Sequence, residues 1–208
     1  MAIFLIKLQQ LREEYALCEK CGLCPQKNKI NGVVKSSGPP SSLAIIGEAP
    51  GADEDSAGEP FVGRAGKMLD KLLYGAKIKR HQVFITNAVK CRPTQNNGKK
   101  NRTPTASECE SCRPWLYKEL ELVNPKVIVT LGKISTESVL ALPKNFKLGD
   151  YVNKINYTHL RKEDSEDIVT NERIVIPCWH PSYLMQHGRK KFDEAVDCFR
   201  LAKKLVVR

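Results

Sequence analysis

The stretch IIGEAPGADEDSAGEPFVGRAGKMLDKLL, residues 45–73, joins the end of an apolar strand to a turn rich in glycine and acidic residues and then to a helix. The strand begins in the run LAII at residue 43. The helix is predicted over residues 65–74, because four apolar residues share one of its faces: Met68, Leu69, Leu72 and Leu73. A strand that leads directly into a helix is typical of an α/β sheet.

Three further apolar runs rich in β-branched residues predict buried parallel strands, at residues 83–86, 127–130 and 174–176. Helical patterns separate them or follow them, at residues 107–122, after a capping box of Thr105 and Glu108, and at residues 190–207. We therefore predict a single domain over residues 1–208, with a three-layer α/β/α fold around a central four-stranded parallel sheet. Its site is expected at the carboxyl ends of the strands.

Two segments fall outside this alternation. Residues 93–102, PTQNNGKKNR, predict an exposed basic loop, and residues 146–160 predict a small hairpin followed by a charged turn at residues 161–173.

The charge of the chain suits a polyanionic partner. Its 208 residues include 34 Lys and Arg against 23 Asp and Glu, a formal net charge of +11, which favours nucleic acid or an anionic membrane surface. The N-terminal residues 1–21 have helical apolar spacing but carry Lys7, Arg12 and glutamates, so they lack the long apolar run of a signal peptide or membrane span. We expect a cytoplasmic protein with no membrane association.

Eight cysteines in a cytosolic chain indicate metal rather than a disulfide framework. The clustered ones are Cys18, Cys21 and Cys24 in CEKCGLC, Cys91 in NAVKC, and Cys109 and Cys112 in CESC. Four thiolates brought together suit either a tetrahedral zinc site or an iron-sulfur cluster, and the spacing does not choose between them. Cys178 and Cys198 stand alone and are expected to be buried apolar residues.

The glycine-rich turn does not have the sequence of a phosphate-binding loop. It has no GKS or GKT and no complete GxGxxG, and its acidic run would repel phosphate. The glycines instead let the backbone pass close to a flat ligand, on which Phe61 could stack; the alternative is that Phe61 is part of the core. Asn87 and His180 each follow a predicted strand, so we expect both to face the same crevice as Phe61.

These residues carry a resemblance to a known family. GEAPG with EPFVGRAG, then ITNAVKCRP with NRTP, and the late HPSYL together resemble the family-4 uracil-DNA glycosylases, the iron-sulfur type found in bacteria and archaea. The resemblance runs from about residue 17 to the final helix. It implies an enzyme of base excision repair that flips uracil out of DNA and hydrolyses its N-glycosidic bond.

The resemblance also implies a [4Fe-4S] cluster between the N-terminal segment and the loop and helix at residues 91–112. Its expected ligands are Cys18, Cys21, Cys91 and Cys112. The chain departs from the family in having the additional Cys24 and Cys109, either of which leaves the assignment open, and a longer QNNGKK segment before NRTP.

The resemblance gives each pocket residue an expected role. Phe61 stacks on the uracil, Asn87 reads its polar edge, and His180 donates a hydrogen bond to the charge that develops on O2. Where better known uracil glycosylases of another family place an aspartate, this chain has Ala49, so Glu48 is the candidate for holding the water. The remaining expected contacts with uracil are Gly47, Ala49 and Glu54.

Phosphate contacts are expected from residues around this pocket: Arg92, Lys99, Lys100, Arg102, Ser182, Arg189 and Lys190. By similarity, Leu184 is expected to enter the gap left by the flipped base. A monomer is expected, and a sliding-clamp partner is left open. The alternatives are a related iron-sulfur glycosylase of broader damaged-base specificity, a non-enzymatic nucleic-acid module with a metal cluster, and an electron-transfer protein.

Overall fold

The computed structural model describes residues 2–23, 32–159 and 172–207. Its main sheet has the strand order β2-β1-β5-β7-β6. The four strands β1 (Leu43–Gly47), β2 (Phe84–Asn87), β5 (Val127–Leu131) and β7 (Arg173–Cys178) pair in parallel, as the sequence predicts. Their carboxyl ends therefore meet at one edge, where Gly47 is level with Asn87.

A fifth strand at the edge of the sheet differs from the sequence prediction. The strand β6 (Asn156–Thr158) pairs antiparallel with β7. The segment before it forms a 3₁₀ helix, Leu148–Asp150, and so does not supply the second strand of the expected hairpin at residues 146–160. The strand β6 therefore pairs with the edge of β7 rather than within a local hairpin. Most of the expected charged turn at residues 161–173 lies outside the described residues.

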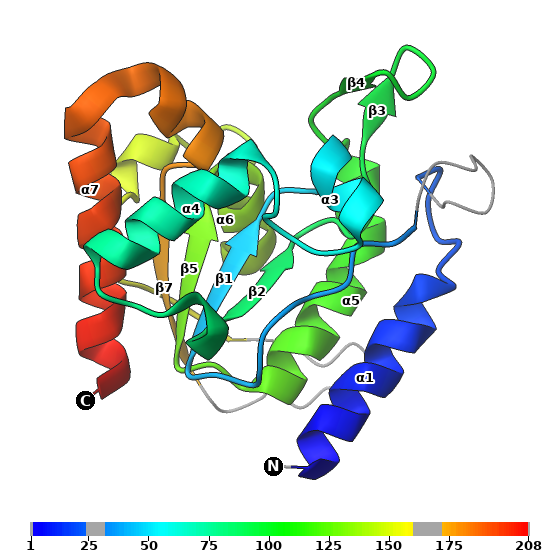
Figure 1. The fold of residues 1–208 in the computed structure, drawn as a ribbon, viewed down its shortest axis with the longest axis horizontal. Helices are drawn as coiled ribbons and strands as arrows, with labels where there is room; N and C mark the ends of the chain where they lie inside the picture. The colour runs from blue at the N-terminus through cyan, green and yellow to red at the C-terminus, as the bar shows by residue number, and fades with distance from the viewer. Residues whose placement is uncertain (1, 24–31, 160–171, 208) are drawn as a thin grey trace.

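Helices cover both faces of the sheet (Figure 1). On one face lie α4 (Arg64–Gly75) and α7 (Pro181–Val207), whose apolar residues pack with Ile45 and Val129. On the other lie α1 (Ala2–Ala16), α5 (Ala106–Val123) and α6 (Lys133–Leu140), which bury Ile46 and Ile128. Alternate strand residues point to opposite faces, so each strand serves both cores. The three-layer α/β/α architecture is confirmed.

The ends of the helices follow local signals. Glu108 N donates to Thr105 Oγ1 at 3.3 Å, and the Glu108 carboxylate accepts from Thr105 N at 2.7 Å, so the predicted capping box begins α5. The final helix starts earlier than predicted, at Pro181, and it breaks at Gly188, whose φ of 72° is left-handed. The acidic run after β1 is a short helix, α3 (Ala52–Ala57), rather than a turn.

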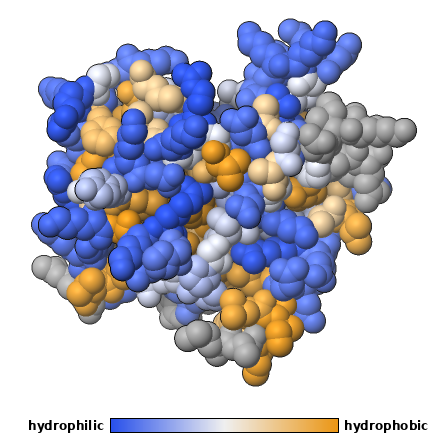
Figure 2. Space-filling model, viewed as in Figure 1, coloured by the Kyte–Doolittle hydropathy of each residue, from blue (hydrophilic) through white to orange (hydrophobic). Residues whose placement is uncertain are grey.

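Two exposed features extend from this body. Residues 93–102, expected as a loop, include the small hairpin of β3 (Thr94–Gln95) and β4 (Lys100–Asn101), which stands out beside α3 in Figure 1. The first turns of α1 expose four apolar side chains, and Figure 2 shows this apolar surface at the lower edge of the molecule: Ile3, Phe4, Leu5 and Ile6. Among the described helices, none combines the length and apolar character needed to span a bilayer.

Candidate active site

A cleft opens at the carboxyl ends of the parallel strands. The segment after β1, the end of β2 and the segment after β7 supply Glu48, Asn87 and His180 to it. Its wall includes many of the residues singled out from the sequence: Glu48, Ala49, Glu54, Phe61, Asn87, Arg102, His180 and Ser182. Residues far apart in the chain thus meet where the strand order predicts a site.

Gly47 lies directly against the two residues expected to bind a flat ligand. A Cβ at this position would lie 2.3 Å from Asn87 Oδ1 and 2.5 Å from Phe61 Cζ. Asn87 and Phe61 are 4 % and 6 % exposed, and within the described part of the chain the Asn87 amide has no hydrogen-bond partner. The site therefore pairs an aromatic ring with an amide that can both donate and accept.

The Phe61 ring is held by a strained turn. Phe61 has a φ of 57°, which is costly for an aromatic residue. The Arg80 guanidinium donates to Pro60 O at 3.0 Å and to Phe61 O at 2.9 Å. On the other side of the turn, Glu54 Oε1 accepts from Val62 N at 3.0 Å and from Gly63 N at 2.8 Å. The Glu54 carboxylate is thus occupied in holding the Phe61 turn, although the residue also lines the cleft.

His180 is held as a neutral imidazole. Burial lowers the pKa of His180 to about 4, and the charge of Glu54 opposes this shift. Its Nδ1 lies 3.2 Å from Ser182 N and 2.7 Å from Ser182 Oγ. Because a backbone N–H can only donate, Nδ1 accepts, and the ring proton of the neutral form is on Nε2. His180 can therefore donate a hydrogen bond from Nε2 without carrying a charge.

Glu48 directly precedes Ala49, the position at which this chain has no aspartate. It lines the cleft beside Ala49, and burial raises its pKa above the ordinary value. Val89 N donates to Glu48 O at 3.0 Å, which fixes the backbone at this position. A carboxylate with a raised pKa is a stronger proton acceptor than an exposed one.

A second, smaller cavity is lined by cysteines. Four thiols from three parts of the chain surround it: Cys18, Cys21, Cys91 and Cys112. Cys109 packs against the same apolar cluster without lining this cavity, and Cys24 lies outside the described residues. Cys178, at the end of β7, and Cys198, on α7, are fully buried in the core, as expected.

The chemistry of this cavity suits a cluster. Trp115 Nε1 donates to Cys18 Sγ at 3.1 Å and Lys90 N donates to Cys112 Sγ at 3.2 Å, contacts that stabilise thiolate ligands. Burial raises the pKa of Cys109 and Cys112 to about 11, so a thiolate there needs a bound cation. In the described ranges, no three His, Cys, Asp or Glu side chains gather as the ligands of one ion.

Comparison with known proteins decides the family. A model of the uracil DNA glycosylase superfamily matches residues 35–202. The chain belongs to this superfamily. Two similar relatives are named type-4 uracil-DNA glycosylase. The protein from Sulfurisphaera tokodaii is 37% identical over 177 residues, 84% of this chain and 74% of the relative. The protein from Thermotoga maritima is 37% identical over 181 residues, 86% of this chain and 84% of the relative.

The type-4 assignment follows from identity and coverage taken together. A protein named type-5 uracil-DNA glycosylase, from Mycobacterium leprae, covers 96% of this chain and 89% of the relative, but it is only 29% identical over 217 residues. A protein named type-5 uracil-DNA glycosylase, from Thermus thermophilus, is 33% identical over 118 residues, half of this chain and 51% of the relative. The chain is accordingly a type-4 member of the uracil-DNA glycosylase superfamily, and the resemblance seen in its motifs is confirmed.

Several basic residues of this glycosylase are engaged within the protein. Arg102 makes two contacts with the Glu108 carboxylate, at 2.6 and 2.8 Å, and Arg189 pairs with Asp193 at 3.1 Å. Arg92 Nε donates to Asn101 Oδ1 at 2.7 Å. Of these arginines, Arg102 lines the cleft, whereas Lys99, Lys100 and Lys190 are exposed on the surface.

The position of Leu184 differs from the role expected for it. Leu184 is 4 % exposed and packs in the core with α4 and the sheet, so in this conformation it does not project from the surface. The next residue, Met185, is 39 % exposed and lines the cleft. Which of the two adjacent side chains faces outward depends on the rotation of the first turn of α7, which the motif HPSYL does not specify.

Sequence reasoning about the glycosylase missed the residues that support the site from behind. Arg80, which holds the Phe61 turn, and the buried pair Lys90 and Glu119 were not singled out. The sequence position of Lys90 could have drawn attention to it, because the residue lies between a predicted buried strand and an expected cysteine ligand. A lysine is ordinarily exposed, so a lysine at that position needs a partner inside the protein. Arg80 and Glu119 have no local motif, since their partners are distant in sequence.

Proposed function

We propose that the protein is a DNA repair glycosylase that flips uracil out of DNA and hydrolyses its N-glycosidic bond, leaving an abasic site. The observation that carries this proposal is the convergence of Phe61, Asn87 and His180 on one cleft against Gly47. A base inside a stacked duplex is out of reach, so the substrate nucleotide must be everted at a cost of a few kcal/mol.

Recognition of uracil would depend on Phe61 and Asn87. Uracil stacks on the Phe61 ring, and the Asn87 amide pairs with its O4 and N3–H. Cytosine presents a donor and an acceptor in the reverse order, so it would leave buried polar groups unpaired, a difference that discriminates strongly between substrates.

Bond cleavage would depend on His180 and on a bound water. As the C1′–N1 bond breaks, its electron pair goes to the base and the sugar becomes cationic. The Nε2–H of neutral His180 donates to uracil O2 and stabilises the developing anion. The water oxygen then bonds to C1′, and its proton passes to a carboxylate or to solvent. Glu48 is our candidate for that carboxylate because of its place in the cleft and its raised pKa.

DNA binding would combine phosphate contacts with insertion of an apolar side chain. Arg102 and Ser182 line the cleft, Arg92 is held by Asn101 of β4, and Arg189 lies on α7. We assign insertion to Met185 rather than Leu184, because Met185 already presents its side chain to the cleft.

The cofactor we propose is a [4Fe-4S] cluster bound by Cys18, Cys21, Cys91 and Cys112. The cluster would join the segment after α1, the segment after β2 and the helix α5 through its bonds to their cysteines. Its role would be structural, because hydrolysis of the glycosidic bond needs no electron transfer. We further propose that the enzyme acts as a monomer in the cytoplasm.

A uracil-release assay tests this function. The purified protein should release free uracil from an oligonucleotide with one U·G pair, and its iron content and visible absorbance should report the cluster. Substrates with ethenocytosine and hypoxanthine separate the type-4 activity from a broader one. Retention of full activity after replacing Phe61, Asn87 and His180 together would mean that the base binds elsewhere.

The role of Glu48 is tested separately. In Glu48→Gln the single-turnover rate of uracil release should fall about 10²-fold, as expected for loss of a proton-accepting group, while DNA affinity stays within about twofold. Equal losses of rate and affinity would assign Glu48 to binding rather than to chemistry.

A further inference from the structure

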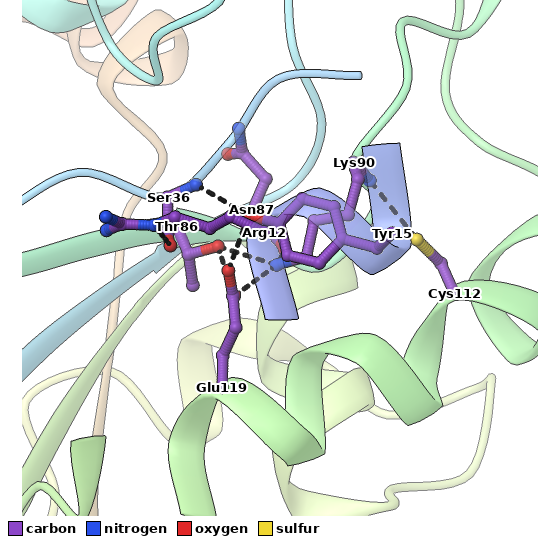
Figure 3. Close-up of polar contacts among 8 residues, drawn as sticks. All are labelled: Arg12, Tyr15, Ser36, Thr86, Asn87, Lys90, Cys112 and Glu119. Atoms are coloured by element: carbon purple, nitrogen blue, oxygen red, sulfur yellow. Dashed lines mark hydrogen bonds and ion pairs between the residues drawn. The ribbon is translucent and has the colours of Figure 1, made fainter. Parts of the chain in front are cut away.

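A buried ion pair lies between the active-site cleft and the cysteine cavity. The Lys90 ammonium is 2.5 Å from Glu119 Oε2, and the two side chains are 2 % and 0 % exposed (Figure 3). A buried ion pair seldom stabilises a protein more than apolar side chains of the same volume would, because both charges lose their hydration. Its presence therefore calls for an explanation other than stability.

The hydrogen bonds of this pair are complete and specific. Lys90 Nζ donates to Glu119 Oε2, to Thr86 Oγ1 at 2.6 Å and to Asn87 O at 2.9 Å. The Glu119 carboxylate also accepts from Thr86 Oγ1 at 2.7 Å and from Tyr15 Oη at 2.9 Å. All three ammonium protons have an acceptor, so the network admits one arrangement of the groups around it.

The network fixes the turn that follows β2. Lys90 folds back over its own turn and binds the carbonyl of Asn87, while Figure 3 shows the Asn87 amide pointing away from the ion pair. Two contacts tie the same turn to the segment after β1: Ala88 N donates to Gly47 O at 2.9 Å, and Val89 N donates to Glu48 O at 3.0 Å. The Asn87 amide, which we propose reads uracil, is therefore attached to a turn whose backbone is fixed by Lys90 on one side and by Gly47 and Glu48 on the other.

The same turn reaches the cysteine cavity within four residues of Asn87. The backbone N–H of Lys90 donates to Cys112 Sγ at 3.2 Å, and Cys91, the next residue, lines the cavity. Helix α5 also connects the cysteine cavity to the ion pair, because Cys112 and Glu119 lie two turns apart on it. One rigid segment therefore carries Asn87 at one end and a cysteine of the proposed cluster at the other.

We propose that Lys90 and Glu119 are positioning residues that hold residues 86–91, so that occupancy of the cysteine cavity and the aim of the Asn87 amide are coupled. The ion pair touches neither the base nor the cluster and acts through the backbone of this turn. The kinetic part of the proposal rests on the proposed function, whereas the structural part does not.

The test uses a charge-free double variant, Lys90→Met with Glu119→Gln, which removes the pair without leaving one buried charge alone. The matched control is Val196→Ala, a change in α7 at a residue that is 3 % exposed and belongs to the core cluster on the other face of the sheet, which contains none of residues 86–91. Each protein is purified with its iron and compared at equal iron content. Hydrogen exchange of residues 86–91, uracil release and DNA affinity are measured.

We expect the double variant to exchange amide hydrogens in residues 86–91 about tenfold faster than the unaltered protein, and to lose about tenfold or more in the single-turnover rate, since a small displacement of a reading group is costly. DNA affinity should stay within about twofold because the phosphate contacts are unchanged. The control should lower the melting temperature without either effect.

Unchanged exchange of residues 86–91 in the double variant would overturn the proposal, as would equal kinetic losses in Val196→Ala at the same melting temperature. If the double variant does not fold, Thr86→Val is used instead, because it removes one acceptor of Lys90 and one donor to Glu119. Its hydrogen exchange at residues 86–91 and its single-turnover rate are then judged in the same way. If the unaltered protein releases no uracil, the proposed function fails, and the exchange measurement alone decides whether the pair positions the turn.

Discussion

At Gly47 the absence of a side chain is what allows the pocket to form. A Cβ there would collide with Asn87 Oδ1 and the Phe61 ring. We therefore expect Gly47→Ala to lower the single-turnover rate about 10²-fold by displacing one or both groups, with a smaller effect on DNA affinity.

The matched control for this change is Gly149→Ala. A Cβ at Gly149 would meet Trp179 at 3.6 Å, an ordinary contact away from the cleft. Its rate and melting temperature should stay close to those of the unaltered protein. A Gly47→Ala protein with full activity would show that Asn87 and Phe61 do not need their present positions.

His180 gives a prediction about pH. Its pKa of about 4 means that the imidazole stays neutral, with its proton on Nε2, at every pH above about 5. Nitrogen-15 NMR should show this tautomer and no titration of His180 between pH 8 and 5.5. A titration midpoint near 6.5 would contradict the buried, neutral state.

The same residue also affects stability. The unfolded chain binds the His180 proton with a pKa near 6.5, whereas the folded chain does not bind it until about 4. The unfolded state therefore holds more protons between these values, and the free energy of unfolding falls as the pH is lowered from about 6.5 to about 4. Above that range His180 adds no pH dependence.

At the scale of elements, the turn between α3 and α4 depends on Arg80. Arg80→Met removes the Nη2 group that donates to two carbonyls, Pro60 O and Phe61 O. Because Phe61 has a strained φ, we expect its ring to become mobile and uracil release at subsaturating DNA to fall about tenfold.

The ion pair between Arg80 and Asp70 provides the control for this change. Arg80 Nη1 also contacts Asp70 at 2.8 Å, in a pair whose side chains are 33 % and 53 % exposed. Asp70→Asn removes that charge and keeps both carbonyl contacts, so it should leave the rate within about twofold, as expected of an exposed pair. The same loss in both variants would assign the effect to the ion pair instead of the turn.

The β3–β4 hairpin gives a prediction about DNA binding. Lys99 and Lys100 are exposed on it, above the side of the cleft that Asn101 and Arg102 line. Changing both to Gln should weaken binding to any DNA sequence and reduce the slope of log affinity against log salt by up to about two units. Fluorescence anisotropy at several salt concentrations measures both effects.

Lys79 and Lys126 provide the matched control for the hairpin. Both are exposed, but they precede β2 and β5 and so lie at the amino ends of the strands, opposite the cleft. Changing these two to Gln removes the same charge and should alter the salt slope much less. Equal slopes in the two double variants would mean that only the net charge of the molecule matters.

At the scale of the whole molecule, the sequence predicts most of the framework of this protein. The four parallel strands follow from short β-branched runs, and α5 begins at its predicted capping box. Asn87 and His180 could be assigned to one cleft because parallel strands place their carboxyl ends together.

The parts that could not be predicted depend on contacts between distant residues. Tyr15 and Glu119 are 104 positions apart, and no local pattern relates them. The edge strand β6 was misassigned because its partner is β7 rather than a neighbouring segment. Leu184 was placed outside because the motif gives its order in the chain but not the face of α7 that packs on the core.

The route of the chain through the cysteine cavity has a consequence for biosynthesis. Cys18 and Cys21 leave the ribosome early, but Cys91 and Cys112 follow only after the first two strands of the sheet, β1 and β2, have been translated. The apolar side chains of α1 that pack on α5, including Leu8 and Leu11, have no partner on the nascent chain until then. The proposed cluster could therefore be bound by all four cysteines only after Cys112 has been translated, and until then the unpaired N-terminal helix is the segment that a chaperone would need to shield.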